Sequence, residues 1–310
     1  MGRLIILLVL LVEVLTACSS GGKTSDIKDN TSKVFIEQTN HIQQVHDDKT
    51  NKVNPIVCSY IIGGYASEQW LDVDNTFKQL KGDEKYKIYK MTECLGEGKG
   101  LSKEDITEDV QGAQPKVNIR FGRDTFKVKL PNATSSDYPL NFSNQIAIGA
   151  DWNALPRIPK VQSNNIDAYK NVIAGVIGKH GFSSNQVSLK QVLKIDIEGD
   201  GVDEVVLTAS NAGSPLSSES MDRKYSIVML RKLIAKKVEN IILREEYYLD
   251  GKSSLGFGAT MLYVPFILDA NGDGNMEIFV EGIYTPGNFM DVYEVKGRDA
   301  KRVLTNGVSA

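Results

Sequence analysis

The sequence predicts a mainly β fold with one helix near residues 165–180, and an α+β arrangement with two β domains is the alternative. Three observations support this class. The chain has 310 residues, of which 41% are hydrophobic, enough to form a packed core. Its apolar segments beyond residue 53 are short and bounded by turn-forming residues, as strands usually are. A single segment instead carries apolar residues at helical spacing.

The first part of the chain, residues 1–17, has the pattern of an export signal. An apolar run, Leu4–Val12, follows Arg3 and resumes after Glu13. The run is shorter than the roughly 20 residues that span a bilayer, but it fits the core of a signal peptide. It ends in Leu15-Thr16-Ala17-Cys18, which resembles the lipobox of bacterial lipoproteins.

The lipobox resemblance implies that Cys18 is acylated and becomes the new N-terminus, so that a lipid anchor makes the membrane a partner. Ser19 stands where an inner-membrane retention signal would have aspartate. The implied location is the cell envelope: the outer membrane where two membranes are present, and otherwise the outer face of the plasma membrane. A secretory signal without lipidation, or a buried N-terminal strand, is the alternative.

Residues 18–52 are predicted to form a flexible tether. Ser, Gly, Lys, Asp, Asn, Gln and Thr predominate, with Val34–Ile36 as a short apolar cluster. Such a composition buries too little surface to offset the entropy lost when the chain becomes ordered. Beyond the tether we expect an N-terminal β region, 53–160, and a second region, 161–310, which contains the repeated calcium-loop motif described below.

Strands are predicted wherever a short β-branched or alternating segment ends at turn residues. These segments are Ile56–Ile62, Tyr86–Met91, Phe126–Leu130, Gln145–Ile148, Val205–Leu207, Tyr225–Leu230, Leu262–Val264, Glu277–Val280, Val292–Val295 and Arg302–Leu304. The glycine-rich Gly96–Gly100 has neither the P-loop nor the dinucleotide-binding spacing, and we interpret it as a loop.

The predicted helix begins near Asn165-Ile166-Asp167. Its apolar residues share one face, and they are Ile166, Tyr169, Val172, Ile173, Val176 and Ile177. Lys179-His180-Gly181 ends it, with basic residues at the carbonyl end and a glycine suited to the left-handed cap. We therefore interpret His180 as a helix-end residue and not as a catalytic one.

Cys58 and Cys94 are the two cysteines that remain once Cys18 is assigned to the lipid. The export signal places them in an oxidising compartment, where disulfides persist. We predict that they form a disulfide, which would close a loop of about 36 residues and contribute about 3–4 kcal/mol in the chain-entropy model. Two buried thiols, which behave as small apolar side chains, are the alternative.

One motif with metal-binding chemistry occurs twice. Residues 196–204 read Asp-Ile-Glu-Gly-Asp-Gly-Val-Asp-Glu, and residues 269–277 read Asp-Ala-Asn-Gly-Asp-Gly-Asn-Met-Glu. Both follow the pattern Asp-x-(Glu/Asn)-Gly-Asp-Gly-x-x-Glu, with five of the nine positions identical. Both lie between apolar, strand-like segments. We call residues 196–204 the first loop and residues 269–277 the second loop.

Calcium needs six to eight oxygen ligands, and side-chain oxygens at positions 1, 3 and 5 of a tight turn converge on one centre. Glycine at position 6 permits the turn, a carbonyl at position 7 adds an oxygen, and glutamate at position 9 adds a carboxylate. The predicted ligands of the first loop are Asp196, Glu198, Asp200, Val202 and Glu204. Those of the second loop are Asp269, Asn271, Asp273, Asn275 and Glu277. The pattern predicts one or two Ca²⁺ sites, with Asp203, at position 8, pointing away.

The repeated pattern resembles the FG-GAP and VCBS-type repeats of integrin-like β-propellers and of many exported bacterial proteins. The resemblance covers about Val192–Leu304 and implies a β-propeller-like fold, complete or incomplete, with calcium in the turns. Ordinary Asp-Gly hairpin turns on a solvated surface are the alternative. A helix-flanked EF-hand is disfavoured because both loops lead into strand-like segments.

Composition also limits the function classes. A net charge of −3 gives no basis for expecting nucleic acid, because phosphates bind to basic surfaces. Familiar catalytic motifs are missing, and no catalytic residue is assigned. We predict a lipid-anchored, calcium-stabilised binding module for a protein or glycan partner. The alternatives are an envelope polymer hydrolase, whose catalytic carboxylates the sequence does not reveal, and a purely structural envelope protein.

The substitution Cys18→Ser tests the anchor. We expect the variant to remain an uncleaved precursor or to be released from the membrane, because it lacks the thiol that carries the acyl chains. Mass spectrometry of the N-terminal peptide measures the modification directly. A wild-type protein with an unmodified N-terminus at another residue would contradict the lipoprotein assignment.

Overall fold

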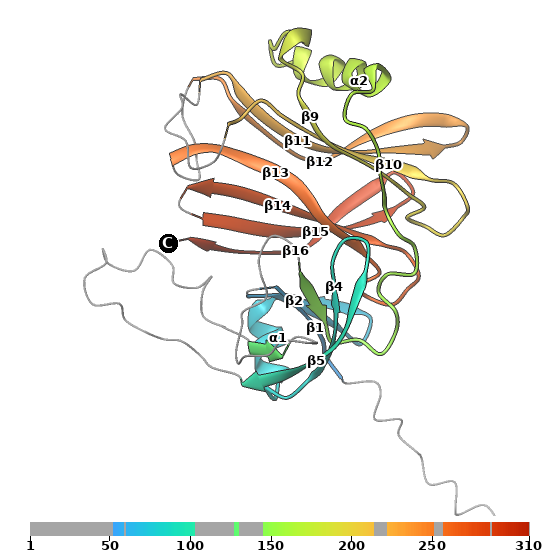
Figure 1. Ribbon diagram of the computed structural model, residues 1–310, viewed down its shortest axis with the longest axis vertical. Coiled ribbons are helices and arrows are strands. Elements are labelled where there is room, and N and C mark those ends of the chain that lie inside the picture. Colours follow the sequence, from blue (N-terminus) through green and yellow to red (C-terminus); the bar gives the residue numbers. More distant parts are fainter. Residues whose placement is uncertain are drawn as a thin grey trace, which may run out of the picture. The chain divides into compact units, whose positions relative to one another are not determined.

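Figure 1 shows the computed structural model, which describes residues 52–58, 60–102, 127–129, 145–213, 222–250, 257–285 and 287–309. These residues belong to one compact unit, Asp48–Ala310. They form three antiparallel sheets, none of them closed, and two α-helices, so the predicted mainly β class is confirmed. Cys18 and the tether up to residue 51 lie outside the described residues. Within the described ranges, no helix is long and apolar enough to cross a membrane.

The first sheet has seven strands in the order β3-β2-β1-β7-β4-β5-β6. Their bounds are β1 Asn54–Val57, β2 Ile61–Ala66, β3 Gln69–Leu71, β4 Lys85–Tyr89, β5 Cys94–Ser102, β6 Lys127–Lys129 and β7 Ile146–Ile148. The single strand predicted over Ile56–Ile62 is wrong, because the chain reverses after Val57, which pairs with Ile61. Gly96–Gly100 is not a loop but part of β5, where pairing with β4 outweighs the weak strand preference of glycine.

Helix α1, Val73–Gln79, was not expected from the sequence. Asp72 caps it, since its carboxylate accepts a hydrogen bond from the Asn75 N–H at 2.8 Å. Val73 and Phe77 pack one turn apart against a buried cluster of the seven-stranded sheet. A helix of seven residues repeats its apolar spacing only once, so the periodicity that identifies longer helices cannot develop.

The second sheet has five strands in the order β12-β11-β10-β9-β8, a simple meander. Their bounds are β8 Lys160–Val161, β9 Leu189–Ile195, β10 Glu204–Ser210, β11 Lys224–Ile234 and β12 Lys237–Tyr248. The expected boundary between regions 53–160 and 161–310 falls inside β8, which pairs with β9. Buried apolar side chains from all three sheets also pack together in one core.

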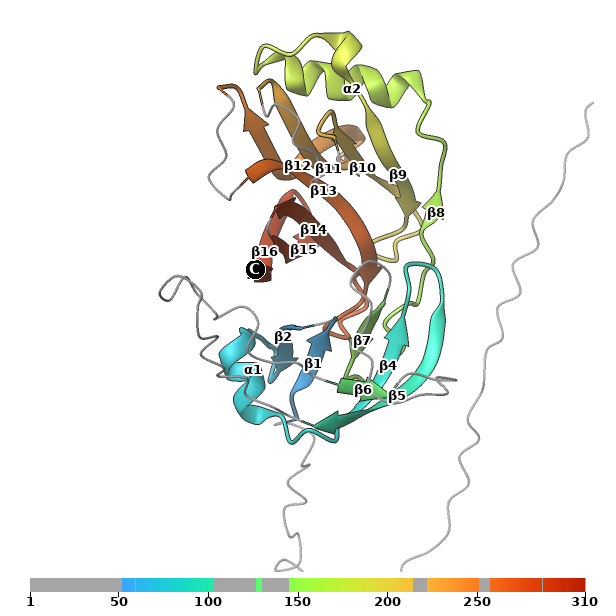
Figure 2. The ribbon, with the colours of Figure 1, turned by 60° about the vertical axis from the view of Figure 1, so that its left-hand side comes forward.

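Helix α2, Asp167–Gly178, lies across one face of the five-stranded sheet (Figure 2). Ile173 and Ile177 are fully buried there against apolar residues of β9, β10 and β11, so the predicted helix and its buried face are confirmed. His180 follows the helix and stacks on Tyr247 of β12, with ring centroids 3.7 Å apart. A short 3₁₀ turn, Ser184–Gln186, leads from the helix toward β9.

The third sheet has four strands in the order β13-β14-β15-β16, again a meander. Their bounds are β13 Phe257–Leu268, β14 Glu277–Thr285, β15 Gly287–Lys296 and β16 Asp299–Ser309. The buried Asn306 of β16 donates a hydrogen bond to the carbonyl of Ile61 in β2, at 2.6 Å. The last strand of the third sheet is thereby joined to the seven-stranded sheet.

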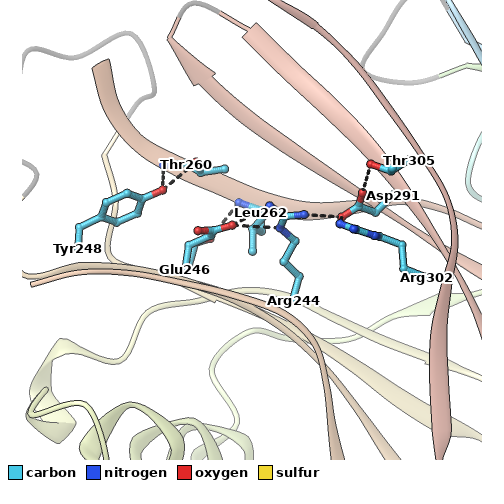
Figure 3. Close-up of polar contacts among 9 residues, drawn as sticks. Arg244, Glu246, Tyr248, Thr260, Leu262, Asp291, Arg302 and Thr305 are labelled. Atoms are coloured by element: carbon cyan, nitrogen blue, oxygen red, sulfur yellow. Dashed lines mark hydrogen bonds and ion pairs between the residues drawn. The ribbon is translucent and has the colours of Figure 1, made fainter. Parts of the chain in front are cut away.

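Strand β13 is an edge strand whose outward N–H groups are satisfied by side chains of the five-stranded sheet. The pairs are Thr260 N with Tyr248 Oη (3.0 Å), Leu262 N with Ser226 Oγ (2.9 Å) and Val264 N with Gln191 Oε1 (2.7 Å). Figure 3 shows the first of these pairs. The accepting residues come from β12, β11 and β9, so β13 runs across the sheet instead of extending it.

A buried ion-pair network joins the same two sheets farther along (Figure 3). Arg244 of β12 donates to the fully buried carboxylate of Asp291 on β15, with Nη1 and Oδ2 at 2.7 Å. Thr305 donates to the other oxygen of Asp291 at 2.6 Å, and Arg302 lies 3.6 Å away. Two cations and a hydroxyl therefore surround the Asp291 carboxylate, and both of its oxygens have a partner.

Cys58 and Cys94 are not bridged in the structure, so the predicted disulfide is absent from it. Cys58 lies in the buried turn between β1 and β2, where its Sγ contacts the Tyr60 carbonyl at 3.5 Å. Cys94 begins β5 and is exposed. One thiol faces the core and the other faces solvent, an arrangement that the spacing of the cysteines in the sequence does not reveal.

The substitution Gln191→Met tests how the edge of β13 is satisfied. The amide of Gln191 both accepts from Val264 N (2.7 Å) and donates to Val264 O (2.9 Å), and Val264 is fully buried. We expect the free energy of unfolding to fall by about 1–3 kcal/mol, because both backbone groups lose their partner. Chemical denaturation measures the loss.

The exposed Gln162 offers the matched control for this experiment. Gln162→Met should change the free energy of unfolding by less than about 0.5 kcal/mol. Equal stability of the wild type and Gln191→Met would contradict the role given to the Gln191 amide.

Candidate metal centre

The two acidic loops occupy equivalent places in the second and third sheets. The first loop joins β9 to β10, and the second joins β13 to β14. In each hairpin the residue before the first aspartate pairs with the glutamate at position 9: Ile195 with Glu204, and Leu268 with Glu277. The two loops therefore have the same length and the same register.

The carboxylate of the first aspartate organises each loop by accepting hydrogen bonds from both loop glycines. The N···O distances are 2.7 Å (Gly199) and 2.9 Å (Gly201) to Asp196, and 2.7 Å (Gly272) and 3.1 Å (Gly274) to Asp269. All four glycines have positive φ, from 75° to 88°, where a side chain would strain the backbone. Backbone conformation therefore explains why both loops have glycine at positions 4 and 6.

The carboxylates at positions 5 and 9 also hold the backbone of each loop. The pairs are Asp200 Oδ1 with Val202 N (2.9 Å), Asp273 Oδ1 with Asn275 N (2.8 Å), Glu204 Oε2 with Ile197 N (2.9 Å) and Glu277 Oε2 with Ala270 N (2.7 Å). Each of these carboxylates has a second oxygen, so backbone contacts leave ligand capacity at the same residues. Three predicted ligand positions therefore share one hydrogen-bonding scheme in both loops.

The two loops lie side by side. The Met276 N–H of the second loop donates to the Ile197 carbonyl of the first at 3.0 Å. Arg157 reaches both loops: its guanidinium donates to the carbonyls of Asp196 (2.5 Å) and Ile197 (2.8 Å), and to that of Gly274 (2.6 Å). One arginine therefore fixes the position of each loop against the other.

The segment that contains Arg157 also covers the second loop. Trp152 donates from its indole nitrogen to the Asp269 carbonyl at 2.8 Å, and Asp269 N donates to the Ala154 carbonyl at 2.8 Å. The indole ring lies so close to Gly272 that an added Cβ would stand 3.0 Å from it. Glycine at this position therefore serves both the backbone angle and the packing of Trp152.

Position 3 differs between the loops. In the second loop Asn271 is buried, and its Oδ1 accepts the Asp273 N–H at 2.9 Å. In the first loop Glu198 turns away from the loop backbone and forms an ion pair with Lys232, with Oε2 and Nζ at 2.5 Å. The longer side chain thus reaches a cation on a neighbouring strand.

The strand that follows each hairpin contributes a charge opposite position 9. In the five-stranded sheet Val205 pairs with Arg231, so the next residues, Glu204 and Lys232, lie opposite each other. Lys232 is almost fully buried, with 5% of its side chain exposed. The first loop therefore has an ammonium beside its carboxylates.

The equivalent position of the four-stranded sheet carries the opposite charge. Ile278 pairs with Tyr293, so Glu277 and Glu294 lie opposite each other. Asp273, Glu277 and Glu294 each offer a carboxylate oxygen, and the three oxygens lie within 4.8 Å of one another. Glu294 is thus an acidic group at the second loop that the loop sequence does not contain.

Within the group formed by Asp273, Glu277 and Glu294, one carboxylate oxygen of Glu277 is buried without a hydrogen-bond partner among the described residues. Glu277 is 1% exposed, and the oxygen concerned is Oε1. Burial raises the pKa of Glu277 well above its usual range, and the neighbouring Asp273, Asp269 and Glu294 raise it further. An oxygen that is buried, unpaired and surrounded by carboxylates is the feature that a bound cation would satisfy.

The second loop fits a calcium ion in its donor chemistry. Its side chains supply carboxylate and amide oxygens, the hard ligands that Ca²⁺ prefers, and Glu294 adds one more. Asp273, Glu277 and Glu294 would hold the ion, and ligation by Asp269 and Asn271 stays a prediction. The carbonyls of Val202 and Asn275, predicted as ligands at position 7, stay predictions. So does the binding of metal by Asp196, Glu198, Asp200 and Glu204.

Three residues of the candidate site were not predicted from the sequence. Glu294 and Lys232 lie 17 and 28 residues beyond their loops, and only the pairing of strands places them at position 9. Arg157 precedes both loops and binds their backbone carbonyls, a contact that leaves no mark in sequence spacing. A comparison of the third strands after aligning the loops would have revealed Lys232 against Glu294.

Comparisons of the chain with known protein families, with curated proteins and with solved structures gave no match. The resemblance to FG-GAP and VCBS-type repeats therefore stays a prediction from the sequence. The assignment of the metal centre depends on the residues and geometry of this chain.

Glu281 is a second buried carboxylate on β14, four residues beyond Glu277 on the same strand. It accepts hydrogen bonds from the Tyr263 hydroxyl and from Asn288 Nδ2, the latter at 2.9 Å. Burial raises the pKa of Glu281, and the two hydrogen bonds oppose this effect in part. The folded protein therefore holds a proton on Glu281 over a pH range in which the unfolded chain has released it.

This difference predicts a pH effect on stability. As the pH rises from the ordinary glutamate pKa through the raised value of Glu281, the wild type should lose free energy of unfolding, because the folded state binds more protons there. The variant Glu281→Gln cannot titrate, so its stability relative to the wild type should increase with pH across that range. Urea denaturation at several pH values measures the difference.

The exposed Glu97 provides a control that also removes one carboxylate. The relative stability of Glu97→Gln should show no comparable rise. If the stability difference between Glu281→Gln and the wild type stays constant from acidic to neutral pH, the raised pKa of Glu281 is wrong.

Proposed function

We propose that this protein is a lipid-anchored, calcium-stabilised binding module of the bacterial cell envelope, which presents its folded part to a protein or glycan partner. The observation that carries the proposal is the unpaired Oε1 of Glu277, buried beside Asp273 and Glu294 at the second loop. The anchor is proposed from the lipobox resemblance at Cys18, and the partner class is the one expected in the sequence analysis.

Calcium would act here by neutralising charge that the fold concentrates. Without a cation, the carboxylates of Asp273, Glu277 and Glu294 repel one another across less than 5 Å. A bound Ca²⁺ replaces this repulsion by attraction and holds the start of β14 against β15. Because the unfolded chain has no such site, binding stabilises only the folded state.

The arrangement of the strands supports the proposed relation to propeller repeats. Strands β9–β12 and β13–β16 each form a four-stranded antiparallel meander, and each carries its acidic loop between its first two strands. A propeller blade is a four-stranded sheet of this kind. We propose that the two meanders are blade-like repeats, with the seven-stranded sheet added before them.

The substitution Asp273→Asn tests the metal. In the wild type, excess Ca²⁺ should raise the free energy of unfolding by about 2.7 kcal/mol at a hundredfold excess over Kd, and hence raise the melting temperature. Kd should lie at about 10⁻⁴–10⁻³ M, the range of extracellular calcium modules. Asp273→Asn and Glu294→Gln should each lose most of this gain, as measured by thermal unfolding in EDTA and in Ca²⁺.

Asp203→Asn is the control, since Asp203 is an acidic residue of the first loop and does not belong to the proposed site at the second loop. Its carboxylate pairs with Lys160 and Lys194, each at 3.3 Å. The calcium-dependent gain should be unchanged in this variant. Identical melting temperatures of the wild type in EDTA and in about 5 mM Ca²⁺, roughly five times the weaker Kd above, would exclude a calcium site.

A further inference from the structure

The two loops share a backbone but differ in the charge that the next strand places beside them. We infer that Lys232 takes the place of a metal ion in the first loop, so that the protein binds one divalent cation, at the second loop. The inference depends on the proposed function, because it assumes that a loop of this pattern binds Ca²⁺ when no internal cation occupies it.

The first argument is positional. Lys232 lies opposite Glu204 on β11, and Glu294 lies opposite Glu277 on β15, so the two residues occupy the same place relative to their loops. At this place one loop has an ammonium and the other has a carboxylate. Loops with the same backbone therefore have a positive side chain beside position 9 in the first case, Lys232, and a negative one in the second case, Glu294.

The second argument is burial. The Lys232 side chain is 5% exposed, and its Nζ lies 2.5 Å from Glu198 Oε2. Lys232 also opposes the effect of burial on Glu204, lowering the pKa that burial raises. Lys232 Nζ makes no hydrogen bond within the described residues, and the ion pair with Glu198 balances its charge, so displacement would leave a buried ammonium without a partner, at a high cost.

The lysine near the second loop behaves differently. Lys296 Nζ lies 3.1 Å from Glu294 Oε1, but 64% of the Lys296 side chain is exposed. An exposed ion pair is weak and its lysine can turn into solvent without losing hydration. Lys296 therefore leaves the carboxylates of the second loop accessible to a metal ion, as Lys232 does not in the first loop.

Position 3 is consistent with this division. Glu198 in the first loop has the reach to meet the Lys232 ammonium, whereas the shorter Asn271 in the second loop stays within the loop and accepts a backbone N–H. Glu198, which the sequence predicts as a calcium ligand, is explained instead as the partner of a lysine. The difference at position 3 and the difference on the following strand therefore belong together: the first loop has a Glu–Lys ion pair where the second loop has Asn271 and Glu294.

The experiment counts bound calcium ions in the full-length protein and in Lys232→Met, by equilibrium dialysis with Ca²⁺ and by calorimetric titration. We expect one ion per chain in the wild type and two in Lys232→Met, because the variant frees Asp196, Glu198, Asp200 and Glu204 for a metal. Asp200→Asn in the Lys232→Met background should return the count to one, which assigns the added ion to the first loop.

Two further variants keep the test decisive if Lys232→Met folds poorly without metal. Lys232→Met combined with Glu198→Gln removes both charges of the ion pair, and this variant should be less dependent on Ca²⁺ for folding than Lys232→Met alone. Glu294→Lys gives the second loop the charge found in the first, and it should bind no calcium while remaining folded in EDTA. Lys296→Met, the exposed lysine control, should still bind one ion.

The outcomes separate this inference from the proposed function. Two ions in the wild type, or one ion in both the wild type and Lys232→Met, would overturn the inference and leave the calcium module intact. No ion in the wild type and one in Lys232→Met would overturn the calcium site of the second loop, and with it the expected count of one ion, but would support the replacement of a metal by Lys232 in the first loop. No ion in either protein would overturn both.

Discussion

The hydrogen bonds from loop glycines to the first aspartate are the interaction on which the rest of the structure depends. The Asp196 and Asp269 carboxylates each bind two glycine N–H groups and so set the path of the chain through a tight turn. That path places the glutamate of position 9 opposite the residue before the aspartate, which fixes the register of both hairpins. Because a shift by one residue would exchange the two faces of a strand, the turn also decides which side chains enter the core.

Much of the fold is visible in the sequence, because the signals concerned are local. The apolar face of α2 repeats over three turns, and the strands around both loops alternate or consist of β-branched runs. The loops themselves are recognisable since glycine and aspartate are required at fixed positions. Among the elements that escaped prediction, α1 is too short to show a period, and β12 mixes charged and apolar residues over its length.

The site is less predictable than the fold, since its decisive charges come from strands far along the chain. Three carboxylates in the two meanders differ in the charges that surround them. Asp291 is neutralised by Arg244, and Glu198 by Lys232, both within the protein. The charged neighbours of Glu277 are the carboxylates of Asp269, Asp273 and Glu294. Nothing in the nine-residue motif distinguishes these cases, because the difference depends on which residue the ladder places opposite position 9.

The way β13 is covered has a consequence for how copies of the protein behave toward one another. An open edge strand offers a row of N–H and C=O groups that can pair with a strand from another molecule and start aggregation. Side chains of the five-stranded sheet occupy this row at Thr260, Leu262 and Val264, and Asn306 ties the opposite edge strand to Ile61. The four-stranded sheet is thus closed to intermolecular strand addition along these stretches, and the register irregularities of β13 around Thr260 and Val264 add to this protection.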